Sequence, residues 1–406
     1  MSSGMATGGE LMKALVVSPQ PFFSPRGTPF SVYYRSLITA ELGVEIDLLT
    51  YGEGQDVVIP GLRILRIPRF GFLGNVKTGP SALKLFLDFF LLLRTIGLLI
   101  RNRYDVVHAH EEAVFFCRFL KPLFRFKLIY DMHSSLPQQL TNFNFTKSKA
   151  LIGLFKRLEN SAIKQSEAVI TICPDLANYV ESLIGKDEKH FLIENSIFDD
   201  VKVAVPADAS GSDNALEEVH PLPMAKPLIV YTGTLEAYQG IDLLINGFAK
   251  ALSEMPDARL LIAGGNPDQV IHFRALADQA GLADRCLLTG RVPQRQAKYY
   301  NTIADVIVSP RQSGTNTPLK VYEQLQSGIP LVATDIYSHT QVLNPDVAFL
   351  VPASDDGIAE GLIDAASNEE AANRRVGNAR ELYKVHYSRA AYIDKMTRLF
   401  DLVRAS

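Results

Sequence analysis

The sequence contains few cysteines. Its 406 residues include three, and these lie far apart, at Cys117, Cys173 and Cys286. An odd number of widely spaced cysteines makes neither a disulfide framework nor a Cys-x-x-Cys metal pair, which favours a reducing cytoplasm as the protein's location. There is also little net charge, because 41 basic residues are set against 44 acidic ones. Nucleic acid is therefore a poor candidate for the main partner.

Common phosphate and metal motifs are absent too. The sequence has no G-x-x-x-x-G-K-[ST] loop, no H-E-x-x-H, no Asp-x-Asp and no G-x-G-x-x-G after its first apolar run. P-loop hydrolysis, zincin chemistry, an aspartate-bound metal and ordinary dinucleotide redox chemistry therefore lose support. No secretory signal opens the chain, because residues 1–10 are small and polar, and we leave them out of the fold prediction.

No long hydrophobic run is free of charges. The most apolar stretch, 83–100, approaches the length of a bilayer span, but Lys84, Asp88 and Arg94 interrupt it at helical spacing. We therefore expect that this stretch forms a helix of the globular fold and does not span a membrane.

The sequence does contain short β-branched runs that alternate with longer segments of helical period. With 47% hydrophobic and 21% charged residues, its composition is typical of a globular protein, and its length suggests two or three domains. The alternation predicts βαβ units that build parallel sheets. Strands are predicted at 13–17, 45–50, 105–109, 127–131, 168–172 and 191–193, and again at 228–232, 259–263, 286–288, 306–309, 330–333 and 348–351.

Between these two series, residues 201–226 are rich in Pro, Ala, Ser and Asp and predict a linker. The predicted fold is α/β, with two Rossmann-like, doubly wound parallel sheets facing an interdomain cleft. The first domain is expected over 11–200 and the second over 227–387, while a C-terminal helix at 388–406 packs back on the first. Ligands should bind at the carboxyl ends of the strands.

Charge is unevenly distributed along the chain. Residues 60–165 contain 17 basic and 6 acidic residues, whereas 201–406 contain 19 basic and 24 acidic residues. Two interpretations of the basic sector remain open: a solvated helix face, or a surface for anionic lipid head groups or a phosphorylated acceptor. Because the apolar stretch 83–100 lies in this sector, we expect peripheral, salt-sensitive association with anionic membranes.

The densest chemical signal lies at 309–335, where a strand ends in a polar loop and a helix follows. Thr317 is predicted as the N-cap of this helix and Pro318 as its first residue. Free backbone N–H groups of the first turn suit a diphosphate, and Lys320 adds a full positive charge. Glu323, one turn later, can accept hydrogen bonds from ribose hydroxyls. Alternatively, Lys320 and Glu323 form only a surface ion pair.

This segment resembles the retaining, nucleotide-sugar-dependent glycosyltransferases of family 4, which have the GT-B architecture. The resemblance extends over nearly the whole chain. Glu323, Gly328 and Pro330 match the family pattern, but Thr315 stands where the pattern has its first Glu. The resemblance therefore implies that contact with the donor sugar passes to Thr315 and Asn316.

A second departure lies in the first turn of the second domain. The family usually has Gly-Arg-Leu and then Lys-Gly here, and these two cations grip the donor diphosphate, whereas this chain has Thr234 and Gln239 in their places. Lys320 and Arg311 are candidates to replace the lost charge. Gly233 still lets the backbone approach a phosphate closely, although it also fits a plain strand-to-helix turn.

In the first domain, the resemblance points to residues at strand ends. His133 is the main candidate for contact with the sugar or for acid/base assistance, although a histidine in this position is often only packed. His108 and His110 share one face of a strand, where packing is favoured over a metal pair because no third ligand is evident. Glu111 and Glu112 are alternative general bases.

Three further matches complete the resemblance. Gly27 corresponds to a loop glycine that approaches the donor, and Asn195 corresponds to a residue at the domain junction. The nucleotide base is expected against Arg291, Val292 and Pro293.

Together these features predict a metal-independent hexosyltransferase that takes a nucleoside diphosphate sugar as donor and needs no further cofactor. The family resemblance alone implies that it retains anomeric configuration. The residues expected to bind the donor are Gly27, Gly233, Thr234, Val292, Arg311, Asn316, Thr317, Pro318, Leu319, Lys320 and Glu323, and those expected to act in catalysis are His133 and Thr315. The acceptor is expected to be a glycan, a lipid-linked sugar or a small molecule, in bacterial surface glycan or glycolipid synthesis at the inner membrane face.

Two other functions stay open at this point. The losses at Thr234, Gln239 and Thr315 would also fit a non-catalytic module that binds sugar nucleotides. A sugar-nucleotide epimerase or a phosphorylase on the same architecture is a third interpretation, but nothing in the sequence suggests the cofactor lysine of a phosphorylase.

Overall fold

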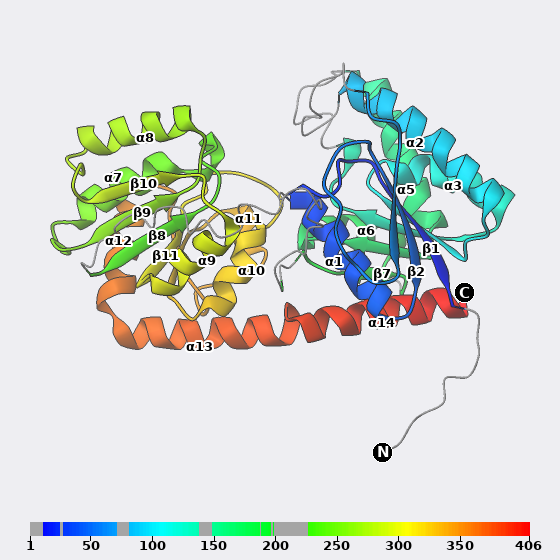
Figure 1. Cartoon of the computed structure of the whole chain (residues 1–406). Helices are drawn as coiled ribbons and strands as arrows, with labels where there is room; N and C mark the ends of the chain where they lie inside the picture. The colour runs from blue at the N-terminus through cyan, green and yellow to red at the C-terminus, as the bar shows by residue number, and fades with distance from the viewer. Residues whose placement is uncertain are drawn as a thin grey trace. The chain divides into compact units, whose positions relative to one another are not determined.

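The computed structural model describes residues 11–24, 27–70, 81–137, 148–186, 188–195, 198 and 226–406. The chain divides into two compact units, which are coloured by residue number in Figure 1. Unit 1 comprises Met1–Pro206 and Arg389–Ser406, and unit 2 comprises Ala207–Ser388. Residues 1–10 and all of the predicted linker except Lys226 lie outside the described residues.

Unit 1 is built on a seven-stranded parallel sheet with the strand order β3-β2-β1-β4-β5-β6-β7. The strands are β1 Lys13–Ser18, β2 Glu45–Thr50, β3 Leu62–Arg66, β4 Val106–His110, β5 Lys127–Met132, β6 Ala168–Thr171 and β7 His190–Leu192. The helices are α1 Gly27–Glu41, α2 Ala82–Arg101, α3 Ala113–Phe124, α5 Lys149–Gln165, α6 Pro174–Ile184 and α14 Arg389–Ala405. The central strands β4, β5 and β6 are buried along nearly their whole length, as expected where helices cover both faces of a sheet.

Unit 2 is built on a six-stranded parallel sheet with the strand order β10-β9-β8-β11-β12-β13. The strands are β8 Leu228–Thr232, β9 Arg259–Ala263, β10 Cys286–Gly290, β11 Val306–Ser309, β12 Leu331–Thr334 and β13 Phe349–Val351. The helices are η1 Ala237–Gln239, α7 Ile241–Ala251, α8 Pro267–Gln279, α9 Gln294–Ile303, α10 Leu319–Ser327, α11 Tyr337–Thr340, α12 Asp355–Ser367 and α13 Glu369–His386. Two Rossmann-like parallel sheets confirm the predicted fold class.

Both sheets reverse their strand order once, between β1 and β4 in unit 1 and between β8 and β11 in unit 2. In open α/β sheets, ligands bind outside the carboxyl ends of the strands at such a reversal. The segments that follow β4 and β11 are therefore the places in each unit where a site is expected.

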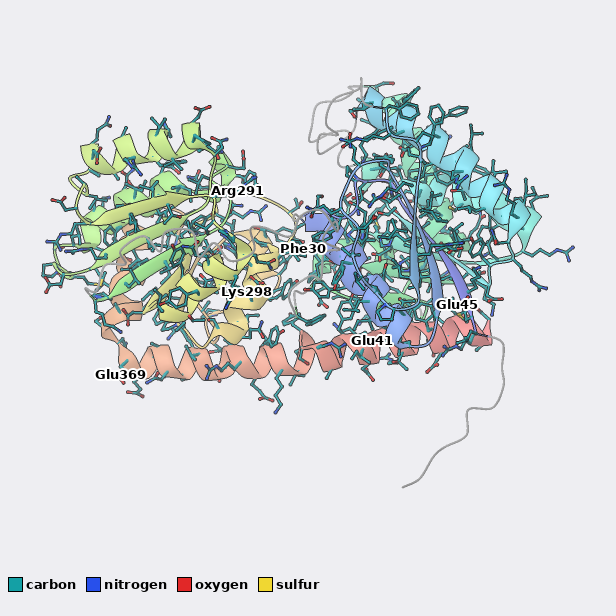
Figure 2. All side chains as sticks on the ribbon, viewed as in Figure 1. Phe30, Glu41, Glu45, Arg291, Lys298 and Glu369 are labelled. Atoms are coloured by element: carbon teal, nitrogen blue, oxygen red, sulfur yellow. The ribbon has the colours of Figure 1, made fainter. Side chains whose placement is uncertain are left out.

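The last helix, α14, belongs to the core of unit 1. Its Tyr392, Met396, Leu399, Phe400 and Val403 are buried in one cluster with residues of β1 and β2. At its start, Arg389 forms an ion pair of 2.5 Å with Glu41 at the end of α1, which is labelled in Figure 2. Burial of each large apolar side chain contributes about 1.5–3 kcal/mol relative to exposure, so α14 stabilises unit 1 although 182 residues separate it from the rest of that unit.

Helix α2 contains the apolar stretch 83–100. Its inward face buries Leu87, Leu91 and Leu98 in the core of unit 1, while large apolar side chains remain exposed on its other side. No helix within the described residues is both long and apolar enough to cross a membrane.

Candidate functional site

The loops after β8 and β9 in unit 2 are shaped by glycines. Gly233, directly after β8, has φ 152°, and a Cβ there would lie 3.0 Å from the Tyr231 hydroxyl and 3.5 Å from the Lys320 ammonium nitrogen. A Cβ at Gly264, directly after β9, would collide with the carbonyl oxygen of Gly233. The two turns are thus packed backbone against backbone, and a Cβ at 233 would crowd the Tyr231 hydroxyl while only touching the Lys320 ammonium.

Helix α10 begins one residue later than predicted. Pro318, and not Thr317, is the N-cap residue, with φ −64° and ψ 136°. This conformation suits proline, because the ring fixes φ near −65° while ψ stays extended. No described side chain caps the helix, and the Thr317 hydroxyl is buried without a hydrogen-bond partner among the described residues. Thr317 therefore leaves the first turn uncapped.

Lys320, on the first turn of α10, buries its ammonium group. In the part of the chain that the structure describes, its Nζ makes no hydrogen bond, and it lies 4.1 Å from the centre of the Tyr231 ring. Burial, and then the positive charge of Arg311, lower the pKa of Lys320 to about 7. The alternative ion pair with Glu323 is not formed. Lys320 is thus a buried cation without a counter-charge among the described residues.

Arg311, two residues after β11, is the second cation of this region. Its Nε donates a 2.6 Å hydrogen bond to the Ser313 carbonyl oxygen, and its guanidinium lies 5.1 Å from the centre of the Tyr238 ring. Burial lowers its pKa. No described carboxylate forms an ion pair with Arg311 or Lys320. Two partly desolvated cations, with no ion-paired carboxylate among the described residues, make a candidate anion site.

Thr234 and Gln239, which replace the two cations of the family pattern, lie beside each other. The Gln239 side-chain amide donates a 3.4 Å hydrogen bond to the Thr234 hydroxyl. Gln239 is buried, and its Oε1 has no hydrogen-bond partner among the described residues. The pair keeps an uncharged contact within the segment between β8 and α7, so the positive charge of this region comes from Lys320 of α10 and Arg311 of the loop after β11.

The other predicted donor-site residues of unit 2 surround this region. Thr315 is exposed, and its carbonyl oxygen accepts a hydrogen bond from Gln341. Asn316, Pro318, Leu319 and Glu323 are half-buried.

The residues predicted to meet the nucleotide base follow β10. Val292 is half-buried against the core of unit 2, and Pro293 is the N-cap residue of α9. Arg291 is exposed between them and β10, as Figure 2 shows.

The sequence analysis missed His339, which lies on α11. Its Nδ1–H donates a 2.8 Å hydrogen bond to the Thr334 carbonyl oxygen, so its Nε2 accepts a 3.0 Å hydrogen bond from the Ser309 hydroxyl. Burial lowers its pKa to about 4. A neutral His339 ties the ends of β11 and β12 together under the loop that carries Arg311. A histidine shortly after a predicted strand was the available signal.

In unit 1, three predicted histidines surround one carboxylate. Asp131, at the end of β5, lies 3.1 Å from His108 Nε2, 3.6 Å from His110 Nδ1 and 3.3 Å from His133 Nε2. His110 Nδ1 and His133 Nε2 are 3.0 Å apart. Asp131 is the third candidate ligand that the sequence analysis did not find, since ligand atoms of His108, His110 and Asp131 lie within 4.8 Å of one another.

A fifth residue, Arg35 of α1, decides what this cluster can do. Its Nε donates a 2.7 Å hydrogen bond to Asp131 Oδ2, and its other nitrogens donate to the Tyr392 hydroxyl at 2.9 Å and the Ile193 carbonyl oxygen at 2.8 Å. Burial would raise the pKa of Asp131, but Arg35 holds it well below its usual value. Because the carboxylate already has a guanidinium partner, the set fits a divalent ion poorly.

His110 and His133 are neutral at pH 7. Burial lowers the pKa of His133 to about 4, and it lowers that of His110 well below 6.5, although Asp131 opposes both shifts. His133 follows β5 directly at the carboxyl edge of the sheet and is 3% exposed. It can therefore accept or donate a hydrogen bond, but it is a poor acid at neutral pH.

The remaining predicted residues of unit 1 are spread around the same edge. Glu111 and Glu112 follow β4, and Glu112 forms a 2.6 Å ion pair with Lys84 of α2. Gly27 is the first residue of α1. Asn195 follows β7, and its Oδ1 is buried without a partner among the described residues.

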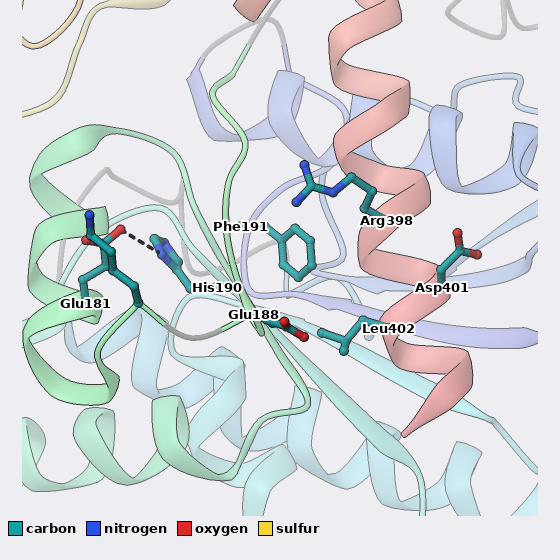
Figure 3. Close-up of a pocket in the computed structure, with 8 residues that line it drawn as sticks. Glu181, Glu188, His190, Phe191, Arg398, Asp401 and Leu402 are labelled. Atoms are coloured by element: carbon teal, nitrogen blue, oxygen red, sulfur yellow. Dashed lines mark ion pairs between the residues drawn. The ribbon is translucent and has the colours of Figure 1, made fainter.

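Unit 1 also holds a cavity that no predicted residue lines. It has a volume of about 630 Å³ and lies between β7 and α14 (Figure 3). Its wall carries charges of both signs, among them His190 and Glu181, whose Nδ1 and Oε1 are 3.7 Å apart. Because the wall carries both positive and negative side chains, the cavity favours neither an anionic nor a cationic ligand.

The chain matches two family models. Residues 212–382 match the model described as Glycosyl transferases group 1, and residues 31–200 match the model described as Glycosyltransferase Family 4. Among curated proteins, a D-inositol 3-phosphate glycosyltransferase of Xylanimonas cellulosilytica is 26% identical over 377 residues, which cover 87% of each chain. A phosphatidyl-myo-inositol mannosyltransferase of Mycolicibacterium smegmatis is 23% identical over 97% of this chain and 94% of its own.

Solved structures share the fold. Sucrose-phosphate synthase from Thermosynechococcus elongatus superposes with a TM-score of 0.69 at 19% identity, over 97% of this chain and all of its own. Anabaena HepE in complex with UDP and glucose superposes with a TM-score of 0.66 at 14% identity, over 96% of this chain and 99% of its own. These likenesses show a GT-B fold.

Proposed function

Because the chain belongs to the group 1, family 4 glycosyltransferases, we propose that it moves a hexosyl group from a nucleoside diphosphate sugar to an acceptor hydroxyl, without a metal ion and with retention of anomeric configuration. One observation carries the donor assignment. The buried ammonium of Lys320 has no hydrogen-bond partner in the described chain and lies near a second cation, Arg311. A diphosphate supplies the missing negative charge.

The geometry suggests a role for each donor-site residue. Lys320, Arg311 and the uncapped amides of α10 would stabilise the negative charge that develops on the departing diphosphate. Glu323, one turn after Lys320, would accept hydrogen bonds from the ribose hydroxyls. Thr315 and Asn316 would contact the sugar. Because two cationic side chains and the helix-end amides stabilise the leaving group, it needs no divalent ion.

In unit 1, His133 is proposed to contact the sugar. A pKa of about 4 makes it a neutral hydrogen-bond partner at pH 7 and not a proton donor. With no carboxylate assigned as a nucleophile, we favour attack by the acceptor on the same face from which the diphosphate leaves. Gly27 would let the backbone of α1 approach the donor.

The acceptor is proposed to reach the enzyme at an anionic membrane surface, in bacterial surface glycan or glycolipid synthesis. The M. smegmatis relative is named for a lipid acceptor. Leu85, Phe89 and Leu93 of α2 and Phe119 and Leu123 of α3 are each about half to three-quarters exposed. Basic residues come after both helices in the sequence. Each basic side chain near an anionic surface contributes on the order of 1 kcal/mol to the free energy of membrane binding. We expect the protein to float with anionic vesicles at low salt and not to float with neutral vesicles.

Release of nucleoside diphosphate tests the enzyme assignment. The purified protein is incubated with a panel of nucleotide sugars and acceptors, with and without EDTA. We expect release that EDTA leaves unchanged; a complete loss that added Mg²⁺ restores would overturn metal independence. The uncharged pair Thr234 and Gln239 also fits a non-catalytic binding module, and binding without release for every acceptor would support that module.

A further inference from the structure

A second cavity in unit 1 has the shape and chemistry of a binding site. It has a volume of about 320 Å³ and is enclosed by α2, the start of α3, the segment after β5, and α5. Helix α3 packs against both α2 and α5, so all of these elements meet on one side of the sheet (Figure 1). The volume lies at the lower end of the range for small-molecule sites.

Most of the wall of this cavity is apolar. Six of its lining residues share this property, namely Leu85, Phe115, Phe116, Leu136, Leu151 and Phe155. Leu85 is 62% exposed and is also part of the exposed apolar face of α2. The apolar wall therefore continues to the outer surface of the helix, and a chain longer than the cavity can extend along it.

The wall of the cavity also carries a cluster of charged side chains, its acidic end. Lys84, Asp88 and Glu112 line it, and Lys84 Nζ lies 2.6 Å from Glu112 Oε1. Asp88 Oδ1 accepts a 2.5 Å hydrogen bond from the Tyr51 hydroxyl. Glu111, next in the chain to Glu112, does not line the cavity, but its carboxyl group interacts with Glu112 and Lys84. The single cation that lines the cavity, Lys84, is already paired with Glu112, so hydrogen-bond acceptors outnumber cations at the acidic end.

Burial and mutual repulsion raise the pKa values of Asp88 and Glu111, as expected for carboxylates that lack enough positive partners. A ligand that donates hydrogen bonds here relieves this repulsion, whereas an anionic ligand increases it. The acidic end also lies directly after β4, at the strand-order reversal of the sheet, where a reacting hydroxyl is expected.

We propose that this cavity binds the acceptor as an amphiphile, with an apolar chain against Phe115, Leu151 and Phe155 and an uncharged, hydroxyl-bearing head group against Asp88 and Glu112. The identification of the ligand as the acceptor rests on the proposed function. The class of ligand rests on the cavity alone: its apolar lining favours an apolar chain, and its acidic cluster favours hydroxyl donors without negative charge.

Calorimetric titration of the full chain with n-alkyl glucosides and with n-alkyl sulfates of equal chain length, below their micelle concentrations, tests the ligand class. The glucosides should bind, with affinity rising about fourfold per methylene until the cavity is filled. The sulfates should bind about tenfold more weakly or worse. Equal or tighter binding of the sulfates would overturn the proposal.

Two variants of α5 locate the binding. Leu151→Trp fills the cavity and should abolish glucoside binding. The matched control, Leu154→Trp, lies on the same helix, is 51% exposed and does not line the cavity, so it should bind as the wild type does. Circular dichroism and retained binding of nucleoside diphosphate by unit 2 verify the fold. Equal glucoside binding by folded Leu151→Trp protein and wild type would overturn the assignment to this cavity.

The same titrations separate this proposal from the proposed function. Nucleoside diphosphate release with water-soluble sugar acceptors, together with no glucoside binding, would overturn the cavity proposal and leave the transferase assignment intact. Glucoside binding that Leu151→Trp abolishes, without release from any donor, would overturn the transferase assignment and leave the ligand class supported.

Discussion

The two units bury charge in opposite ways. In unit 1, the Arg35 guanidinium donates to Asp131, to Tyr392 and to a backbone carbonyl oxygen, so the buried cation has a counter-charge and its donors have partners. In unit 2, the Lys320 ammonium has neither a hydrogen bond nor a carboxylate within the described chain. A balanced buried charge is explained by the fold, whereas an unbalanced one needs a ligand. The fold therefore accounts for the charge of Arg35, whereas Lys320 is a candidate for a functional charge.

The largest expected effect comes from breaking the balanced pair. Asp131→Asn leaves Arg35 buried without a counter-charge and should lower the free energy of unfolding of unit 1 by about 3–5 kcal/mol. Urea unfolding followed by circular dichroism measures the change. A loss below about 1 kcal/mol would show that the pair does not hold α1, β5 and α14 together.

Acid should weaken the same cluster. The pKa of His133 is about 4 in the fold and 6.5 in the unfolded chain, and that of His110 is also lowered, so the unfolded state binds more protons below pH 6.5. Stability is full above pH 6.5 and should fall by on the order of 3 kcal/mol for His133 as the pH drops to about 4. Melting temperatures across this window measure it, and a His133→Gln variant should lose part of the slope. An unchanged slope would contradict the assignment.

Removing the Lys320 cation should leave stability almost unchanged and should weaken nucleotide binding. Lys320→Met deletes a buried charge that costs desolvation, so the free energy of unfolding should stay within about 1 kcal/mol of the wild type. Affinity for nucleoside diphosphate should fall by about 1.5–3 kcal/mol, because a charged contact is lost. The matched control is Lys384→Met, at an exposed position of α13 in the same unit, which should change neither quantity. Loss of stability without loss of affinity would make Lys320 structural.

The smallest expected effect is at the ribose. Glu323→Gln keeps the shape of the side chain and removes its charge, so its hydrogen bonds to ribose hydroxyls should weaken by about 1–2 kcal/mol in total. Titration with a nucleoside diphosphate should show this loss, whereas titration with pyrophosphate should not. Equal losses for both ligands would place Glu323 at the phosphates.

Much of the fold could be predicted from local pattern, because buried parallel strands are continuous apolar runs. Strand β3 was missed, since Leu62–Arg66 lies at the sheet edge and carries two arginines in five residues. The boundary of α10 was wrong by one residue, because Thr317 and Pro318 compete for the cap and sequence alone does not rank them.

The electrostatics of the sites could not be predicted, since they depend on residues far apart in the sequence. Arg35 and Asp131 are separated by 96 positions, so no local pattern reveals that the histidine cluster already has a cation. The charge on Lys320 could be read from the sequence, but its burial against Tyr231 could not. The sequence therefore named candidate residues in unit 2, and the structure adds their burial and their contacts.

Proton uptake on nucleotide binding tests the central claim most directly, that the unbalanced Lys320 receives the donor diphosphate. At pH 8, a lysine with a pKa of about 7 is mostly neutral, and a bound diphosphate should raise its pKa and draw a proton from the buffer. Calorimetric titration at pH 8 in two buffers of different ionisation enthalpy measures this uptake. We predict buffer-dependent binding enthalpies for the wild type and equal enthalpies for Lys320→Met. Tight binding by the wild type with no proton uptake would contradict the claim.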